Sequence, residues 1–231
     1  MSRLLIHVEG ETEETFVNEI LRDHLYTFGY STVGARLLGN ARQRKSRGGI
    51  GSWKAAKKDI INHLNEDLGC VATTMVDYYG LPKSGDGAWV GRREAQNKPF
   101  SEKALTVENA LIEDLSSEMK SNFDQKRFVP YVMMHEFEGL LFSSPKLFGE
   151  GIERKDLVPK FQEIRDQFST PEEINDSYQT CPSRRVKNLF PQYEKRLMGT
   201  FAILEIGLNK IRAECPNFNR WVTHLEKIPD V

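Results

Sequence analysis

Short apolar runs alternate with longer amphipathic segments through the first part of the chain. The short runs are rich in aliphatic or β-branched residues, which is typical of buried strands; they occupy residues 3–8, 31–38, 70–76 and 128–134. The longer segments repeat apolar side chains along one helical face and occupy residues 12–28, 53–68 and 106–119. Strands and helices in this order predict an α/β fold with a mostly parallel sheet flanked by helices.

Individual residues refine this pattern. Gly29 is placed to end the first helix, and Ser52 to cap the second. Pro130 interrupts the last apolar run, which predicts an edge strand or a bulge there. The long segment 78–103 is rich in glycine and reads as a loop, a type of segment that often carries function.

The pattern changes near residue 145, after which helical segments dominate. We expect helices at residues 156–168, 171–177, 183–190 and 199–226, the last one broken at Pro216. The predicted organisation is therefore an α/β domain over residues 1–144 and a helical C-terminal extension over residues 145–231, packed on the sheet.

The overall charge limits the functional classes. Lys and Arg number 32 and Asp and Glu 33, a net charge of −1, which excludes a surface that is basic throughout. No segment approaches the roughly 20 apolar residues of a membrane span, and the N-terminus lacks a signal-peptide core. Three widely spaced cysteines form neither a disulfide framework nor a zinc knuckle. We expect a cytoplasmic protein with no membrane partner.

Carboxylates follow three of the apolar runs directly. Glu9 comes after the first run, Asp77 after the third, and Glu136 and Glu138 after the fourth. Because the carboxyl ends of parallel strands share one edge of a sheet, these acids converge if the strands are neighbours. Clustered carboxylates favour a hard cation such as Mg²⁺ or Mn²⁺. The alternative is that each acid is a helix cap or a solvated turn residue.

The string VEGETE at residues 8–13 resembles the first motif of TOPRIM domains, and most closely that of the overcoming-lysogenization-defect (OLD) nucleases and related small TOPRIM-like proteins. The resemblance implies that Glu9 is the strand-end glutamate and Glu13 a second metal ligand. The second family motif is usually DxD. Asp77 matches its first acid, whereas Tyr79 occupies the place of the second.

The segment HEFEGLLF at residues 135–142 resembles the HExE segment of the small TOPRIM-like proteins, so Glu136 or Glu138 could replace the missing acid. His135 either donates a hydrogen bond to a phosphate or carries a proton, or it is a structural hydrogen-bonding residue. The resemblance implies a TOPRIM/Rossmann-like fold and Mg²⁺-dependent cleavage of phosphodiester bonds in DNA or RNA. It also implies a possible ATPase partner in prokaryotic defence against phage, or in repair.

Basic residues form two candidate phosphate-binding groups. Residues 36–58 contain eight basic side chains and no acid, among them Arg42, Arg44, Lys45 and Arg47. A second group, in which Lys195 is a candidate for stabilising charge on the reacting phosphate, consists of Arg184, Arg185, Lys187, Lys195 and Arg196. Either group could instead be a solvated surface.

The predicted function is a metal-dependent nuclease in which Glu9, Asp77, Glu138 and Lys195 are catalytic. The predicted metal ligands are Glu9, Glu13, Asp77, Glu136 and Glu138. The alternative is a non-catalytic TOPRIM-like module that binds nucleic acid or a partner ATPase, an interpretation that rests on Tyr79. Other hydrolase classes lack support, because the chain contains neither GxSxG nor GxxxxGK[ST].

Overall fold

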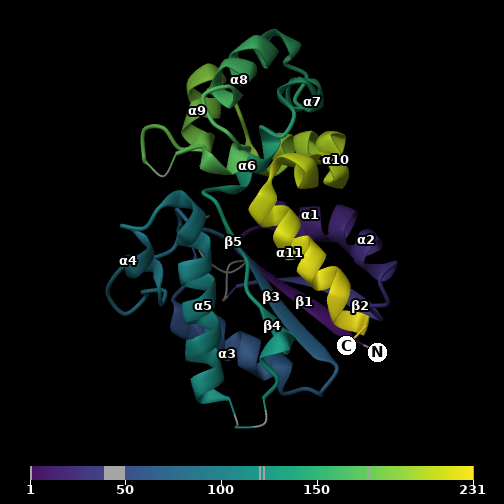
Figure 1. Ribbon diagram of the computed structural model, residues 1–231. Helices are drawn as coiled ribbons and strands as arrows, with labels where there is room; N and C mark the ends of the chain where they lie inside the picture. The colour runs from purple at the N-terminus through teal and green to yellow at the C-terminus, as the bar shows by residue number, and fades with distance from the viewer. Residues whose placement is uncertain (1, 39–49, 120, 122, 176, 231) are drawn as a thin grey trace.

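The computed structural model describes residues 2–38, 50–119, 121, 123–175 and 177–230. Its centre is a parallel sheet in the order β2-β1-β3-β4, in which β5 continues beside β3 after β4 ends (Figure 1). The strands are β1 (Arg3–Val8), β2 (Thr32–Leu37), β3 (Cys70–Asp77), β4 (Phe128–Val129) and β5 (Val132–Met133). The predicted α/β class and the parallel sheet are confirmed.

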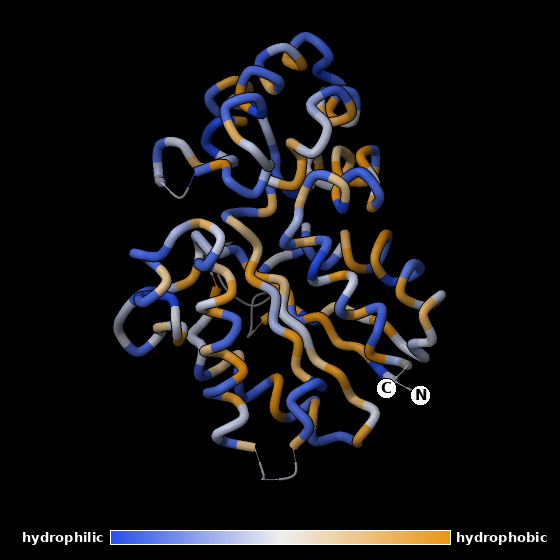
Figure 2. The backbone as a smooth tube through the Cα atoms, in the orientation of Figure 1, coloured by the Kyte–Doolittle hydropathy of each residue, from blue (hydrophilic) through white to orange (hydrophobic). Residues whose placement is uncertain are grey.

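Helices cover both faces of the sheet. On one face lie α3 (Trp53–Leu64) and α5 (Phe100–Glu118), with the short α4 (Arg92–Ala95) beside them. The other face packs against α1 (Glu11–Phe16), a π-helical turn (Val17–Leu21) and α2 (Arg22–Tyr26), which run on as one helical segment. Figure 2 shows the consequence: the strands at the centre are hydrophobic, whereas most outward helical turns are hydrophilic.

The last strand is divided by Pro130, as the sequence predicts. Proline has no N–H to donate to a neighbouring strand, and β4 ends at Val129. The Thr74 hydroxyl bridges the gap: it accepts a hydrogen bond from Tyr131 N and donates one to Tyr131 O, each at 3.0 Å. This threonine keeps the chain attached to β3 until β5 resumes regular pairing.

The C-terminal part is helical, also as predicted. Its helices are α6 (Phe137–Leu141), α7 (Pro145–Gly151), α8 (Val158–Arg165), α9 (Pro182–Leu189), α10 (Thr200–Glu214) and α11 (Pro216–Lys227). Figure 1 shows α6 to α10 above the carboxyl ends of the strands, while α11 returns along the sheet. Helix α11 is held against the sheet through Trp221. Its ring stacks on that of Tyr131 with the ring centroids 4.5 Å apart, and its indole N–H donates a hydrogen bond to the Thr73 hydroxyl.

Several helix boundaries differ from the sequence prediction. Helix α5 starts at Phe100, six residues earlier than expected, because Pro99 occupies the position just before it. Helix α3 ends at Leu64, and Leu68, expected on its apolar face, is 87% exposed. Helix α6 was not expected at all.

A helix was expected over residues 171–177; among the residues of this range that the structure describes, 171–175 and 177, the only helical turn is the 3₁₀ turn Pro171–Glu173. A tertiary contact explains the difference. The buried Glu172 carboxylate accepts hydrogen bonds from the backbone N–H groups of Asn217 and Phe218 at 2.8 and 3.0 Å, at the start of α11. Among the helices of the described segments, none has both the length and the apolar character needed to cross a lipid bilayer.

Candidate metal centre

Glu9 and Asp77 meet at the carboxyl edge of the sheet. Strands β1 and β3 pair in parallel with Val8 opposite Met75, so Glu9 leaves the sheet beside the end of β3. A Glu9 carboxylate oxygen accepts from Asp77 N at 3.4 Å. The close approach requires a small residue at position 80, because a Cβ on Gly80 would lie 3.3 Å from both Glu9 carboxylate oxygens. The convergence expected from parallel strands is therefore present.

Two further acids reach this point from the first turns of helices. Glu13 lies in the first turn of α1 and Glu138 in the first turn of α6, and both side chains are almost fully buried. Asp77 connects the sheet to the second of these helices, because its Oδ1 accepts from Phe137 N at 3.0 Å. We call Glu9, Glu13, Asp77 and Glu138 the acid cluster.

The Lys195 ammonium lies within the acid cluster. Its Nζ is 3.3 Å from Glu13 Oε1, 3.3 Å from Glu138 Oε2 and 3.7 Å from Asp77 Oδ2. The side chain is carried by the π-helical turn Lys195–Gly199, which leads into α10. About 118 residues of chain separate Lys195 from Asp77, so the countercharge of these acids comes from the helical C-terminal part.

Burial and mutual repulsion favour the neutral forms of the acids. Burial raises the pKa of Glu9 to about 7, against the opposing attraction of Lys195 and with a further increase from Glu13. Burial likewise raises the pKa of Asp77 well above its usual value and raises the pKa of Glu138. Burial alone would lower the pKa of Lys195, but the surrounding carboxylates raise it well above its usual value.

The acid cluster has the donor set of a hard divalent cation. Its ligand atoms are all carboxylate oxygens, which suit Mg²⁺ or Mn²⁺. Glu13 Oε1 and Glu138 Oε2 are buried and, within the described part of the chain, accept no hydrogen bond although both lie at ion-pair distance from Lys195. These two buried oxygens face one ammonium and accept no hydrogen bond from the described residues, so they are free to bind a metal ion in its place.

Glu136, also predicted as a ligand, lies at the border of the acid cluster. Its carboxylate accepts from Ser183 N at 3.0 Å, in the first turn of α9. Its charge nevertheless contributes to the raised pKa values of Glu9 and Glu138, so it lies within electrostatic range of both. The contact places α9, and with it Arg184, beside the acid cluster.

His135 and the neighbouring tyrosines are held by structural contacts. His135 Nδ1 lies 2.9 Å from Ile174 O, and its ring packs edge-on against Tyr78. Tyr78 is buried beneath the Arg92 guanidinium, which lies 3.7 Å from the ring centre. Tyr79 N donates to His135 O at 3.0 Å. These contacts favour the structural interpretation of His135.

The predicted nucleic-acid-binding residues fall into two groups. Arg42, Arg44, Lys45 and Arg47 lie outside the described residues. Arg184 is exposed and stacks over the Tyr178 ring at 4.2 Å. Arg185 is engaged locally, because it donates to Thr180 O at 2.8 Å and to Asn175 Oδ1 at 3.1 Å. Arg184 is thus the better placed of the two to meet an external phosphate.

Tyr193 is a residue that the sequence analysis did not single out for the site. Its buried hydroxyl has no hydrogen bond within the described segments, and burial raises its pKa well above the usual value. A Cβ on Gly199 would lie 2.8 Å from this hydroxyl. In the sequence, the one sign that Tyr193 lies beside the acid cluster is that it precedes Lys195 by two residues.

Comparison with protein families gives one match. The model of the domain of unknown function DUF4276 matches residues 8–226, nearly the whole chain. The chain belongs to the DUF4276 family. The matched range includes every member of the acid cluster and Lys195, so the cluster lies inside the DUF4276 domain. Comparison with curated proteins yields no match.

Two solved structures resemble this DUF4276 chain. Both are described as the C-terminal region of the Xanthomonas campestris pv. campestris OLD protein, one phased with platinum and one with iodine. The first has 14% identity and a TM-score of 0.46 and covers 99% of this chain and 94% of its own. The second has 15% identity and a TM-score of 0.43 and covers 100% and 97%. The TOPRIM assignment of the motifs stays a prediction.

Proposed function

We propose that this protein is a metal-dependent nuclease that hydrolyses phosphodiester bonds in DNA or RNA. The observation that supports the proposal most directly is the acid cluster itself: three carboxylates, from α1, β3 and α6, lie at ion-pair distance from the Lys195 ammonium, and the Glu9 carboxylate, just after β1, accepts from the backbone N–H of Asp77. Such a concentration of buried negative charge destabilises the folded protein by several kcal/mol unless protons or cations compensate it. Mg²⁺ or Mn²⁺ is the cofactor that this oxygen donor set fits.

The residues of the chain have distinct roles in this proposal. Glu9, Glu13, Asp77 and Glu138 would hold the metal, with Glu136 as a further ligand at the border. A bound metal would supply an activated water molecule and stabilise charge on the phosphate oxygens. Lys195, whose ammonium lies among these carboxylates, would face the phosphate and offset its developing charge. Arg184 and residues 42–47 bind the flanking phosphates.

The test is a cleavage assay on double- and single-stranded DNA and on RNA, with Mg²⁺ or Mn²⁺ and with EDTA. We expect cleavage by the wild type only with a divalent ion, and its loss in Glu13→Gln. Glu19→Gln is the matched control, because Glu19 is an exposed glutamate on the same helical segment. Absence of cleavage by folded wild-type protein on every substrate, with either ion, would contradict the proposal.

A second candidate is a non-catalytic module that binds nucleic acid or a partner ATPase, in prokaryotic defence or repair. Two observations favour it: Tyr79 stands where an acid is usual in TOPRIM motifs, and Lys195 already compensates the acid cluster. This candidate predicts nucleic-acid binding that weakens steeply with salt and needs no divalent ion. Binding of that kind without cleavage would select it over the nuclease.

A further inference from the structure

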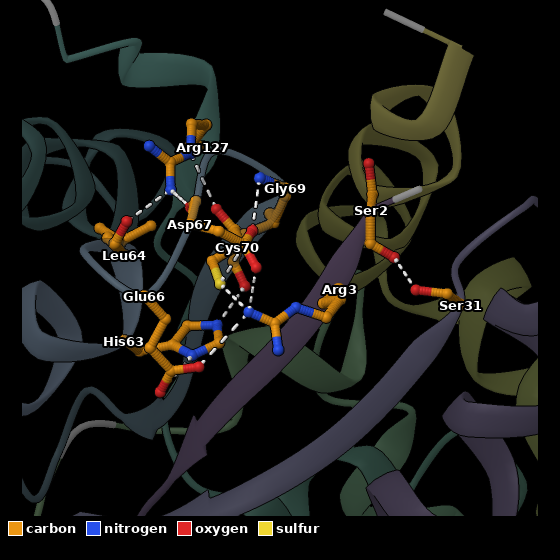
Figure 3. A network of polar contacts seen from close by, with 11 residues as sticks. Ser2, Arg3, Ser31, His63, Leu64, Glu66, Asp67, Gly69, Cys70 and Arg127 are labelled. Carbon is orange, nitrogen blue, oxygen red and sulfur yellow. Dashed lines mark hydrogen bonds and ion pairs between the residues drawn. The ribbon is translucent and has the colours of Figure 1, made fainter.

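A second group of metal-ligating side chains lies at the opposite end of β3. His63 is in the last turn of α3, Glu66 follows the helix, and Cys70 opens the strand. One ligand atom from each of these residues lies within 4.8 Å of the other two. Figure 3 shows the three side chains pointing toward one another. The group is about 23 Å from Asp77, since β3 is eight residues long and rises about 3.3 Å per residue.

The donor types differ from those of the acid cluster. An imidazole nitrogen, a carboxylate oxygen and a sulfur form a ligand set of the kind that binds Zn²⁺ and that Mg²⁺ does not prefer. In tetrahedral zinc sites, bonds of about 2.0–2.3 Å place ligand atoms about 3.3–3.8 Å apart. His63 Nδ1 and Glu66 Oε1 are already 3.7 Å apart. The remaining ligand atoms, which lie within 4.8 Å of one another, would have to move about 1 Å closer to complete the geometry.

The orientation of the histidine suits ligation. His63 is buried, and its Nε2 lies 3.2 Å from the carbonyl oxygen of Val71, to which it can donate. A ligating histidine usually donates its other ring N–H to such a carbonyl, which fixes the ring and leaves the remaining nitrogen for the metal. The remaining nitrogen here is Nδ1, which faces Glu66.

Two arginines organise the loop around Cys70. Arg127 donates to the carbonyl oxygens of Leu64, Asp67 and Cys70 at 2.6, 2.6 and 2.9 Å, which fixes the backbone between α3 and β3 (Figure 3). Arg3 Nη2 lies 2.8 Å from Cys70 Sγ and 2.5 Å from Asp67 Oδ2. A guanidinium can only donate, so the sulfur accepts from Arg3, while the Cys70 thiol can itself donate to Asp67 Oδ1 at 3.6 Å.

Arg3 faces a different oxygen of the Glu66 carboxylate from the one that His63 faces. It approaches Glu66 through Oε2 at 3.5 Å, whereas His63 faces the other carboxylate oxygen, Oε1. The Arg3 guanidinium is shared among the carboxylates of Glu66 and Asp67 and the sulfur of Cys70. We propose that His63, Glu66 and Cys70 form a zinc site that ties the end of α3 to the start of β3. The proposal does not depend on the nuclease function.

The test is titration of the purified full-length chain with Co²⁺, a spectroscopic substitute for Zn²⁺, after treatment with EDTA. A cysteine ligand produces a thiolate-to-cobalt charge-transfer band, which carboxylates alone cannot produce. We expect the band at one equivalent of Co²⁺, its loss in Cys70→Ser, and its displacement by Zn²⁺. Cys181→Ser is the matched control, because Cys181 is the cysteine near Glu136 and the acid cluster. This control retains the band if the proposal is correct.

Two further variants keep the test decisive if Cys70→Ser does not fold. Glu66→Gln changes an exposed residue, and we expect it to weaken Zn²⁺ binding by about 10-fold or more. His63→Gln is expected to weaken it similarly, whereas His224→Gln, at an exposed histidine, leaves it unchanged. The proposal is overturned if the wild type gives no charge-transfer band, or if the band is lost in Cys181→Ser and kept in Cys70→Ser.

Discussion

The two ends of β3 carry two different concentrations of charge. At the carboxyl end, Asp77 joins carboxylates from three other elements, and the compensating group is Lys195. At the amino end, Cys70 joins a histidine and acids from one short connection, and the compensating group is Arg3. The carboxyl end is assembled from distant segments and is buried. The amino end is local and partly exposed.

The difference follows from the direction of the strands. In a parallel sheet the carboxyl ends face the first turns of the following helices, where acids are favoured by the helix dipole. Glu13 and Glu138 occupy such turns. The amino ends face the last turns of the preceding helices, where His63 lies. One sheet therefore offers an oxygen-only ligand set at one edge and a mixed ligand set at the other.

The largest expected effect is the loss of cleavage when an acid at the carboxyl end of β3 is changed, which should leave metal binding at the amino end intact. Asp77→Asn keeps the acceptor for Phe137 N but removes a charged ligand, so we expect divalent-dependent cleavage to fall by at least about 100-fold. The same variant should retain the zinc stoichiometry of the wild type. Initial cleavage rates and metal content by mass spectrometry measure both. Loss of zinc in Asp77→Asn would show that the two ends are not independent.

The next effect concerns the countercharge at the carboxyl end. Lys195→Met removes the ammonium and leaves the buried acids uncompensated. Breaking a buried pair costs about 3–5 kcal/mol, and the 36% exposure of the Lys195 side chain reduces the expected loss to about 1–3 kcal/mol. Denaturant unfolding in EDTA measures the free energy of unfolding, and we expect Mg²⁺ to restore part of it. Lys210→Met, at an exposed lysine on α10, is the control. Equal losses in the two variants would contradict the role of Lys195.

A third effect is the pH dependence of stability without metal. The pKa of Glu9 is about 7 in the folded protein, above its ordinary value of 4.5, so the folded state holds this proton more tightly than the unfolded state. The stabilisation is complete below pH 4.5 and is lost as the pH rises toward 7, by up to about 3 kcal/mol. Glu9→Gln should flatten this slope in EDTA. An unchanged slope in Glu9→Gln would assign the titration to other groups.

The smallest expected effect tests the close packing beside Glu9. In Gly80→Ala the new Cβ lies 3.3 Å from both carboxylate oxygens, so the side chain must shift by a few tenths of an ångström. We expect a several-fold weaker Mn²⁺ affinity by calorimetry and little change in stability. Gly87→Ala is the control, because its Cβ would meet nothing closer than 3.9 Å. Equal affinities in the two variants would show that Glu9 adjusts freely.

Much of the fold follows from local sequence patterns. The strands were predictable because each is a short apolar run, and Pro130 marked the interruption between β4 and β5. The start of α5, the missing helix at residues 171–177 and the short α6 were not predictable. Residues 171–177 depend on the contact of Glu172 with the start of α11, which no local pattern shows.

The acid cluster was only partly predictable from the residues. Strand direction alone brings Glu9 and Asp77 together, whereas Glu13 was indicated by family resemblance and Lys195 by its place in a local group of basic residues. The position of Lys195 depends on the packing of a segment distant in sequence. The proposed zinc site contains a single cysteine, so the spacing of the three cysteines in the sequence did not indicate it. The pattern H-x₂-E-x₃-C becomes informative only when a helix end meets a strand start.

The late position of Lys195 has a consequence for biosynthesis. A ribosome completes Glu9, Glu13, Asp77 and Glu138 well before it reaches the residue that neutralises them. In a nascent chain that ends before Lys195, these carboxylates must stay hydrated, take up protons or bind another cation, because the ammonium that lies among them in the folded protein is absent. The sheet can form early, but its charged edge gains this countercharge only when the segment carrying Lys195 docks.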